Sequence, residues 1–301
     1  MANSISYAQK YSPELDKMIV QESKTGIFTD NAFAAKFKGA RTVLIPVVSY
    51  NGLGDYDRAT GYSKGDVNLK HVEYTLAKER SKQLLIDAQD VDESGVPGLV
   101  GETVGGYTRE MVVPEIDAWA LSKLAGVAAS TEDGKAANIK TYDQTKAVAA
   151  MLETINNVEA SNGYRNDEIV AFVDPIMYGI LMTSTELQRF ITISDFKQGE
   201  IDMKVKKLNG TAIIPVSAER MYTKFVFDDD GFHPDTENNT QTIKALVLPR
   251  KAASLVKKVD KVNVIDCDDV EDMDAYKINY RLYYDLIVKN SHLKTVHAII
   301  G

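Results

Sequence analysis

The sequence has little of what defines several common protein classes. It holds a single cysteine, Cys267, among 301 residues, which excludes a disulfide framework and an all-cysteine metal site. No apolar run approaches the roughly 20 residues that a membrane-spanning helix needs. The first residues lack the basic start and apolar stretch of a secretion signal. We therefore expect a protein that is made without export and kept in a reducing interior.

Positive charge is also in short supply. The 35 Lys and Arg residues stand against 43 Asp and Glu residues, which gives a formal net charge of -8. This balance argues against nucleic-acid binding by bulk charge. Basic residues gather locally at Lys204, Lys206 and Lys207 and again between Arg250 and Lys261, but no aromatic side chains alternate with them. We interpret both groups as solvated or salt-bridging surface.

A long hairpin is predicted in the amino-terminal third. The β-branched run Thr42–Tyr50 is typical of a strand, and a second extended or partly helical passage follows from Val67 to Lys78. Between them, residues 51–65 are rich in tyrosine and glycine and far exceed the ordinary hairpin loop of about 2–5 residues. A strand pair with little core of its own is marginal in isolation. The hairpin therefore indicates contact with a partner. A helix predicted to begin at Ser12 and end at Gly26 indicates the same, because its narrow apolar face has no nearby surface to pack against.

The rest of the chain predicts a body of helices and strands. Period-two alternation from Tyr276 to Val288 is the longest strand signal. A glycine-rich loop is expected between Gly95 and Gly106, before the first long helix. The fold class is α+β, with antiparallel strands and segregated helices. The other expected strands are 169–173, 201–205, 211–216 and 243–248. The expected helices are 111–129, one that starts with a capping box at Thr141 and Gln144 and ends at Asn162, one that starts at Asp174, and a short one at 249–256.

The motifs with catalytic potential lack the context that their chemistry needs. Gly61–Gly65 matches G-x-S-x-G with Ser63 as nucleophile, but that motif requires a buried strand before it and a helix after it. Gly52-Leu53-Gly54 lacks the third glycine and the helix of a dinucleotide site. We expect no catalytic residue, no enzyme activity and no cofactor, and keep a serine hydrolase built around Ser63 as an alternative.

Acidic clusters suggest metal binding only superficially. The turn from Asp228 to Glu237 has calcium-loop register, but Val226 occupies the first ligand position and Pro234 interrupts the loop. Six carboxylates lie between residues 266 and 274. A cluster of this kind is usually a solvated, charged loop that precedes a strand. No two histidines have the i, i+4 spacing of a helical metal site. We expect no metal site; the histidines are His71, His233, His292 and His297.

Taken in order, these segments resemble the major capsid proteins of tailed bacteriophages, which have the Hong Kong ninety-seven fold. No single motif is diagnostic, and the ordered combination carries the resemblance. The segments are RTVLIPVVSY with NGLGDYDRATGYSKGDV, EYTLAKERSKQLLIDAQDVDES, MVVPEIDAWALSKLAG, AFVDPIMYGILMTS, LNGTAIIPVSAERM, and the ending from ALVLPRKAASLVKK to HAII. The resemblance implies an amino-terminal arm (1–38), an extended E-loop hairpin (39–80), a peripheral domain with a long spine helix (81–165), a mainly axial domain (166–280) and closing strands that return to the peripheral domain (281–301).

The resemblance also implies a structural role. Such proteins self-assemble into pentamers and hexamers that form an icosahedral shell around packaged phage DNA. The implied partners are other copies of the chain, portal and scaffolding proteins, and double-stranded DNA in weak non-specific contact, with no membrane. Assembly would occur in the host bacterial cytoplasm and the product would be the virion. The arm and the hairpin would lie on neighbouring subunits, with the contact candidates Leu15, Met18, Ile19, Tyr50, Tyr56, Arg58, Tyr62 and Lys64.

Other functions stay open at this stage. An encapsulin-like nanocompartment shell, which holds a cargo enzyme, would use the same fold. A generic α+β binding module would instead be a well-behaved monomer. Some capsid proteins cross-link an E-loop lysine to an asparagine of a neighbour. Lys64 lies near the corresponding place, but neither the asparagine nor the assisting carboxylate can be matched, so we predict no such bond.

Overall fold

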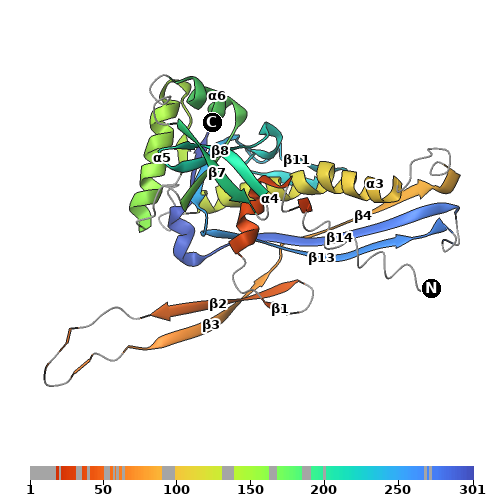
Figure 1. The fold of residues 1–301 in the computed structure, drawn as a ribbon, viewed down its shortest axis with the longest axis horizontal. Helices are drawn as coiled ribbons and strands as arrows, with labels where there is room; N and C mark the ends of the chain where they lie inside the picture. Colours follow the sequence, from red (N-terminus) through yellow and green to blue (C-terminus); the bar gives the residue numbers. More distant parts are fainter. Residues whose placement is uncertain are drawn as a thin grey trace.

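Figure 1 shows three parts: a body of helices and strands, a flat finger that extends from it, and a separate hairpin. This computed structural model describes residues 18–19, 22–31, 36–38, 41–50, 55–56, 58, 61–62, 65–89, 99–130, 139–162, 168–184, 191–198, 201–267, 270 and 273–301. Among these residues, no helix has both the length and the apolar character that crossing a membrane requires.

The body is built on a seven-stranded sheet. Its order is β5-β15-β12-β6-β9-β8-β7, and the pairs are antiparallel except β15 with β5 and β6 with β9. The predicted turn at Asn209 and Gly210 is confirmed, since both residues have positive φ, 50° and 91°, as a two-residue hairpin requires. The strands are β5 (Ile139–Thr141), β6 (Ile169–Val173), β7 (Ile191–Gln198), β8 (Ile201–Leu208), β9 (Thr211–Pro215), β12 (Ile243–Pro249) and β15 (His297–Ile300).

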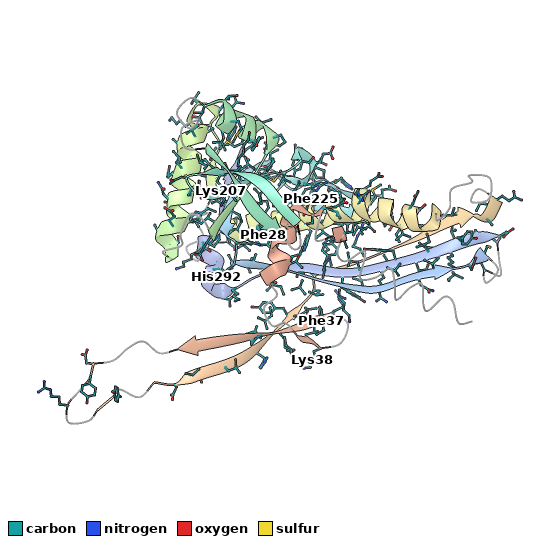
Figure 2. The ribbon with its side chains drawn as sticks, viewed as in Figure 1. Phe28, Phe37, Lys38, Lys207, Phe225 and His292 are labelled. Carbon is teal, nitrogen blue, oxygen red and sulfur yellow. The ribbon has the colours of Figure 1, made fainter. Side chains whose placement is uncertain are left out.

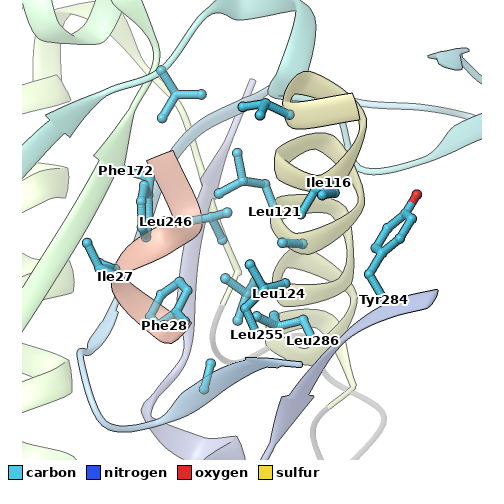
Figure 3. Packing of buried hydrophobic residues seen from close by; sticks show 14 of the residues in the cluster. Ile27, Phe28, Ile116, Leu121, Leu124, Phe172, Leu246, Leu255, Tyr284 and Leu286 are labelled. Atoms are coloured by element: carbon cyan, nitrogen blue, oxygen red, sulfur yellow. The ribbon is translucent and has the colours of Figure 1, made fainter. Parts of the chain in front are cut away.

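Both faces of this sheet are covered. The central strand β6 is buried along its whole length, which matches its unbroken apolar sequence. Its residues alternate between two cores: Ile169 joins the core formed with helices α5 (Ala147–Asn162) and α6 (Pro175–Thr183). Phe172 joins the other, formed with α4 (Val113–Ala129) and the 3-10 helix η1 (Lys24–Asn31), as Figure 3 shows. Sequence segments far apart therefore meet on either side of one strand.

The finger is a three-stranded antiparallel sheet in the order β13-β14-β4, with bounds Ala253–Ile265, Ala275–Val288 and Lys78–Asp87. Alternate residues of β14, from Ile278 to Leu286, enter the same core as α4, which confirms the predicted period-two strand. Helix α3 (Leu99–Tyr107) and the π-helical segment η2 (Thr108–Val112) lead directly into α4. The finger and this helical run lie side by side and together form the elongated part of the molecule (Figure 1).

The predicted hairpin is confirmed. Strands β2 (Thr42–Tyr50) and β3 (Val67–Thr75) pair antiparallel over nine residues, and β1 (Lys36–Lys38) adds a third strand to β2. The class is α+β with mainly antiparallel strands, as expected. The remaining described elements are the ribbon β10 (Phe225–Asp228) with β11 (Gly231–Pro234) and the 3-10 segments η3 (Gln144–Lys146), η5 (Ala218–Arg220) and η7 (Asn290–Thr295).

Three local predictions were wrong. The short helix expected from Pro249 to Val256 does not form: Pro249 ends β12, a turn follows at Arg250 and Lys251, and Ala253–Val256 begin β13. Pairing with the strongly alternating β14 makes these last residues a strand. The glycine-rich loop is helical from Leu99, with Gly105 and Gly106 inside α3. The cap before α5 is Asp143, whose carboxylate accepts from the Thr145 amide at 3.1 Å; Thr141 lies in β5.

The expected segment boundaries do not separate the sheets. The divisions after residues 80 and 280 fall inside the continuous strands β4 and β14. The chain's final strand, β15, joins the seven-stranded sheet of the body rather than the finger. Each sheet is thus assembled from segments distant in sequence.

Candidate assembly surfaces

The base of the hairpin is anchored on the finger. Val43 and Ile45 of β2 and Leu76, just beyond β3, are at most 1% exposed. They pack with three residues of the finger, Val256, Tyr283 and Ile287. Since residues two apart in a strand share a face, one face of the hairpin is fixed by this cluster, which we call the root cluster.

The opposite face of the hairpin carries exposed apolar side chains. Val67 and Leu69 of β3 are 67% and 60% exposed, and the backbone register pairs them with Tyr50 and Val48 of β2. We call Val67 and Leu69 the outer stripe. Along β3 from residue 67 to 75, only Tyr74 is even partly buried. This strand therefore gains almost nothing from its own subunit beyond its ladder with β2.

The described part of the hairpin tip is aromatic and exposed. The rings of Tyr56 and Tyr62 meet edge to face with centroids 5.2 Å apart, yet they are 62% and 87% exposed. Arg58 is exposed beside them. Lys64 and Leu15 lie outside the described residues, as does the side chain of Tyr50. The proposed contact roles of these residues stay predictions.

The amino-terminal segment is fixed to its own subunit from Met18 onward. Ile19 is fully buried in the chain's own core, so in this conformation it offers no surface to a neighbour. Glu22 pairs with Arg109 at 2.8 Å. The helix expected to stop at Gly26 ends earlier: Met18, Ile19 and Glu22 are helical and Ser23 is not. Gly26 lies inside the separate 3-10 helix η1, which continues to Asn31.

A buried carboxylate on α4 holds this segment in place. Asp117 is fully buried and accepts from the hydroxyls of Ser23 at 2.5 Å and Thr25 at 2.7 Å, and from the backbone amides of Lys24 and Thr25 at 3.0 Å each. Arg220 of η5 supplies the balancing charge, with Nη1 at 2.9 Å. Five donors thus converge on one carboxylate. The sequence carries a signal for this role: helical spacing places Asp117 on the apolar face of α4, three and four residues before Ala120 and Leu121.

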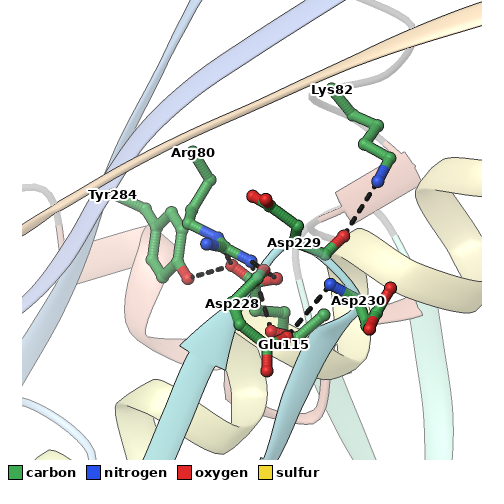
Figure 4. A network of polar contacts seen from close by, with 8 residues as sticks. Arg80, Lys82, Glu115, Asp228, Asp229, Asp230 and Tyr284 are labelled. Carbon is green, nitrogen blue, oxygen red and sulfur yellow. Dashed lines mark hydrogen bonds and ion pairs between the residues drawn. The ribbon is translucent and has the colours of Figure 1, made fainter.

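A cavity of about 310 Å³ lies between the finger, the α4 run and the β10–β11 ribbon. Inside it, Glu115 accepts from Arg80 Nε at 2.9 Å and from the Tyr284 hydroxyl at 2.7 Å (Figure 4). Arg80 also donates to the carbonyls of Asp228 and Gly231 at 2.6 and 3.2 Å. Burial, and then the charge of Glu115, raise the pKa of Tyr284. The charged groups here compensate one another and tie the ribbon to the finger.

The motifs considered for chemistry take structural roles where they are described. Residues 67–75 after the G-x-S-x-G sequence form a strand, not the helix that a nucleophile elbow needs; Ser63 itself lies outside the described residues. Asp228 accepts from the Asp230 amide at 3.0 Å and so closes its own turn. Within the described ranges, no group of three His, Cys, Asp or Glu residues could hold a metal ion.

The architecture is similar to that of solved capsid structures, although the sequence itself has no match. Neither a family model nor a characterised relative matches the sequence. The capsid of cyanophage P-SCSP1u is similar in structure, with a TM-score of 0.59 at 13% identity over 88% of this chain and 84% of that chain. The mature capsid of bacteriophage PhiM1 is similar with a TM-score of 0.54 at 14% identity, over 87% and 82%. The chain has the phage capsid fold.

A virus-like particle from Pyrococcus furiosus matches with a TM-score of 0.51 at 9% identity, over 97% of this chain and 99% of its own. The expected Hong Kong ninety-seven architecture is therefore confirmed for this chain.

Proposed function

We propose that this chain is a structural subunit that self-assembles into a closed shell, with the hairpin of each copy lying on a neighbour. The assembly follows the plan implied by the fold: pentamers and hexamers in an icosahedral shell around packaged phage DNA. The acidic balance of the chain suits a wall that holds DNA without binding it tightly. Portal and scaffolding proteins belong to the same proposal.

One observation carries the proposal: the hairpin has a surface that its own subunit leaves uncovered. Val67 and Leu69 stay exposed on a strand whose outer edge pairs with no other strand among the described residues. Such an edge and stripe favour contact with another chain. Burying the outer stripe on a neighbour stabilises assembly by about 1.5–3 kcal/mol per side chain. Because the same contact recurs at every subunit of a closed shell, this modest free energy adds up over the whole particle.

Assembly of the purified protein tests the proposal. Light scattering and negative-stain microscopy are expected to show closed particles under assembly conditions, with or without a scaffolding protein. A chain that stays monomeric under every condition, scaffold included, contradicts a shell role and supports the binding-module alternative.

A nanocompartment shell of the encapsulin type is the second candidate. The supporting observation is that the structural match to the virus-like particle covers 97% of this chain and 99% of the particle's chain. Contents distinguish the two candidates. Particles isolated from the native source that hold nuclease-protected DNA support the phage shell, whereas particles that hold a single enzyme support the compartment. Neighbouring genes give the same distinction: portal and terminase against a cargo enzyme.

A further inference from the structure

The cavity between the finger, the α4 run and the β10–β11 ribbon has the size of a small-ligand site. Its volume of about 310 Å³ lies at the lower end of the range of such sites, about 300–1,000 Å³. Its helical wall is irregular, because the Val113 amide donates to the Thr108 carbonyl, five residues back, and makes η2 π-helical. Single π-helical turns within α-helices are rare and occur frequently at functional sites. Tyr107, just before η2, and Met111, within it, both line the cavity.

Aromatic rings form much of the cavity wall. The rings of Tyr107 and Tyr280 meet edge to face with centroids 6.1 Å apart, and Phe232 lines the ribbon side. Phe232 in turn packs edge to face on Phe225 at 5.7 Å, and Figure 2 labels Phe225 next to the helical run. The wall is therefore pre-formed by rings that hold one another. Because the faces of aromatic rings attract cations, such a wall suits a positively charged ligand.

The carboxylate of Glu115 makes the interior of the cavity negative. Its side chain is 13% exposed and pairs with Arg80. At the phenols of Tyr107 and Tyr284, however, the charge of Glu115 outweighs that of Arg80: burial, and then Glu115, raise the pKa of both. Within the described part of the chain, Glu115 Oε2 accepts one long hydrogen bond, 3.4 Å from Arg80 Nη2, whereas Oε1 accepts two. A carboxylate has about four acceptor sites, so Oε2 is able to accept from a ligand.

The turn of the ribbon, residues 228–231, adds negative charge on the solvent side of the cavity. Asp228, Asp229 and Asp230 are exposed lining residues, and Figure 4 shows their carboxylates spread around the turn. Arg80 and Lys82 hold this turn through its backbone carbonyls and not through these carboxylates. Four acidic and two basic side chains line the cavity, so acidic groups exceed basic ones by two. The lining therefore favours a cation over an anion of the same shape.

We propose that this cavity binds a small alkylammonium ligand, with the ammonium at Glu115 Oε2 and the alkyl chain against Tyr107 and Phe232. The carboxylates of the ribbon turn attract the charge, and Met111, 54% exposed, offers a further apolar contact. A carboxylate ligand would meet the excess of negative charge, and a neutral alcohol would gain the apolar contacts alone. The site lies within a single chain and does not depend on assembly.

Matched five-carbon probes test the site in the full, unassembled chain. Pentylamine, 1-pentanol and pentanoate share the alkyl chain and differ in charge. In a chain whose methionine methyl groups carry 13C, the resonance of Met111 reports binding in the cavity, and Met111→Leu assigns it among the nine methionines. Pentylamine is expected to saturate the Met111 shift at a concentration roughly three- to tenfold lower than 1-pentanol does, the scale of a cation–π contact. Pentanoate should give no saturable shift.

Variants locate the groups that select the cation. Asp229→Asn combined with Asp230→Asn removes two carboxylates that accept no hydrogen bond among the described residues, while Asp228 is kept because it closes the turn. Pentylamine binding is expected to weaken roughly two- to fivefold, the scale of an exposed ion pair, with 1-pentanol unaffected. Tyr107→Leu removes a ring of the wall and should weaken pentylamine binding roughly three- to tenfold.

The matched control is Glu237→Gln, which removes an exposed carboxylate outside the lining and should bind pentylamine as the parent does. Near-ultraviolet circular dichroism checks that each variant is folded. Equal affinities for pentylamine and 1-pentanol, or tighter binding of pentanoate, overturn the proposal. So does unchanged pentylamine binding in both the double aspartate variant and Tyr107→Leu, and so does an equal weakening in the Glu237→Gln control.

Discussion

Asp117 and Arg220 form an ion pair of 2.9 Å in which the carboxylate is fully buried and the guanidinium side chain is 22% exposed. The pair stands between α4 and η5, and the segment around Ser23 and Thr25 donates into the same carboxylate. One charged group therefore joins three parts of the chain that are remote in sequence. This explains why the amino-terminal segment belongs to the subunit's own core from Met18 onward.

Removing this carboxylate is expected to destabilise the protein strongly. Asp117→Ala leaves the Ser23 and Thr25 donors and the Arg220 charge without a partner, and breaking a buried pair costs about 3–5 kcal/mol. The measurement is the free energy of unfolding in urea, with limited proteolysis of residues 18–31 as a local readout. Glu22→Gln is the control, because its pair with Arg109 is more exposed and is worth under about 1 kcal/mol. Equal, small losses in both variants would refute the role given to Asp117.

The outer stripe is expected to be needed for assembly and not for folding. Leu69→Asp places a charge on a side chain that is 60% exposed in the single chain, so the melting temperature of the unassembled protein should hardly change. Particle yield should fall sharply, since assembly would bury that charge on a neighbour. Asn68→Asp adds the same charge to the adjacent, exposed residue on the other face of β3 and should assemble normally. Equal yields of particles from both variants would refute the role of the stripe.

Elements with one strong local pattern could be predicted from the sequence. The alternation in β14, the apolar run of β6 and the Asn209-Gly210 turn each specify one backbone conformation, and the structure has all three. Residues 253–256 allow two patterns, and their strand conformation depends on pairing with β14, which lies elsewhere in the chain. Periodicity within a short window does not contain that information.

The anchoring contacts could not be predicted for a related reason. Asp117 and Ser23 are 94 residues apart, and Asp285 and Ala77 are 208 apart. An acid on the apolar face of a helix, such as Asp117, indicates that some donor must compensate it, but it does not say which one. The hairpin was predictable as an element, whereas its root cluster was not, because that cluster forms only when β2, β13 and β14 come together.

Lys78 lies between two aromatic rings, with Nζ 4.5 Å from the centroid of Trp119 and 3.7 Å from that of Phe227. Cation–π attraction favours the charged form, yet burial, and then the charge of Arg80, lower the pKa of Lys78. The loss of hydration on burial is thus the larger effect on this ammonium. The ammonium then costs stability at neutral pH, where it is charged in both folded and unfolded chains.

Lys78→Met keeps the apolar stem and removes this charge. It is expected to leave the melting temperature at pH 7 unchanged or slightly raised, and to alter the fluorescence of Trp119, the only tryptophan in the chain. Lys82→Met is the control: its ammonium is exposed and donates to the Asp229 carbonyl, and Trp119 emission should not respond. A clear loss of stability in Lys78→Met would show that cation–π attraction dominates at this site.

His297 is expected to make stability depend on pH in the weakly acidic range. Its side chain lies in β15 at 7% exposure, and its Nε2 has no hydrogen-bond partner in the described part of the chain. Burial lowers the pKa of His297, against a smaller opposing effect of a backbone hydrogen bond with Lys294. The unfolded chain, with a histidine pKa of about 6.5, therefore binds the proton more readily than the folded chain. The stability associated with neutral His297 is fully present above about pH 6.5 and is lost as the pH falls toward the folded-state pKa.

His297→Gln removes this titration while keeping a polar side chain. Between pH 7 and pH 5, the unfolding free energy of the parent should fall more steeply than that of the variant, with the two slopes equal above about pH 7. Part of the slope should remain in the variant, because burial, and then Lys289, lower the pKa of His292 in the same direction. His71→Gln, at an exposed position on β3, controls for the substitution itself and should follow the parent. Parallel curves for the parent and His297→Gln across this range would mean that His297 has the same pKa in the folded and unfolded chains, and would remove it as the source of acid sensitivity.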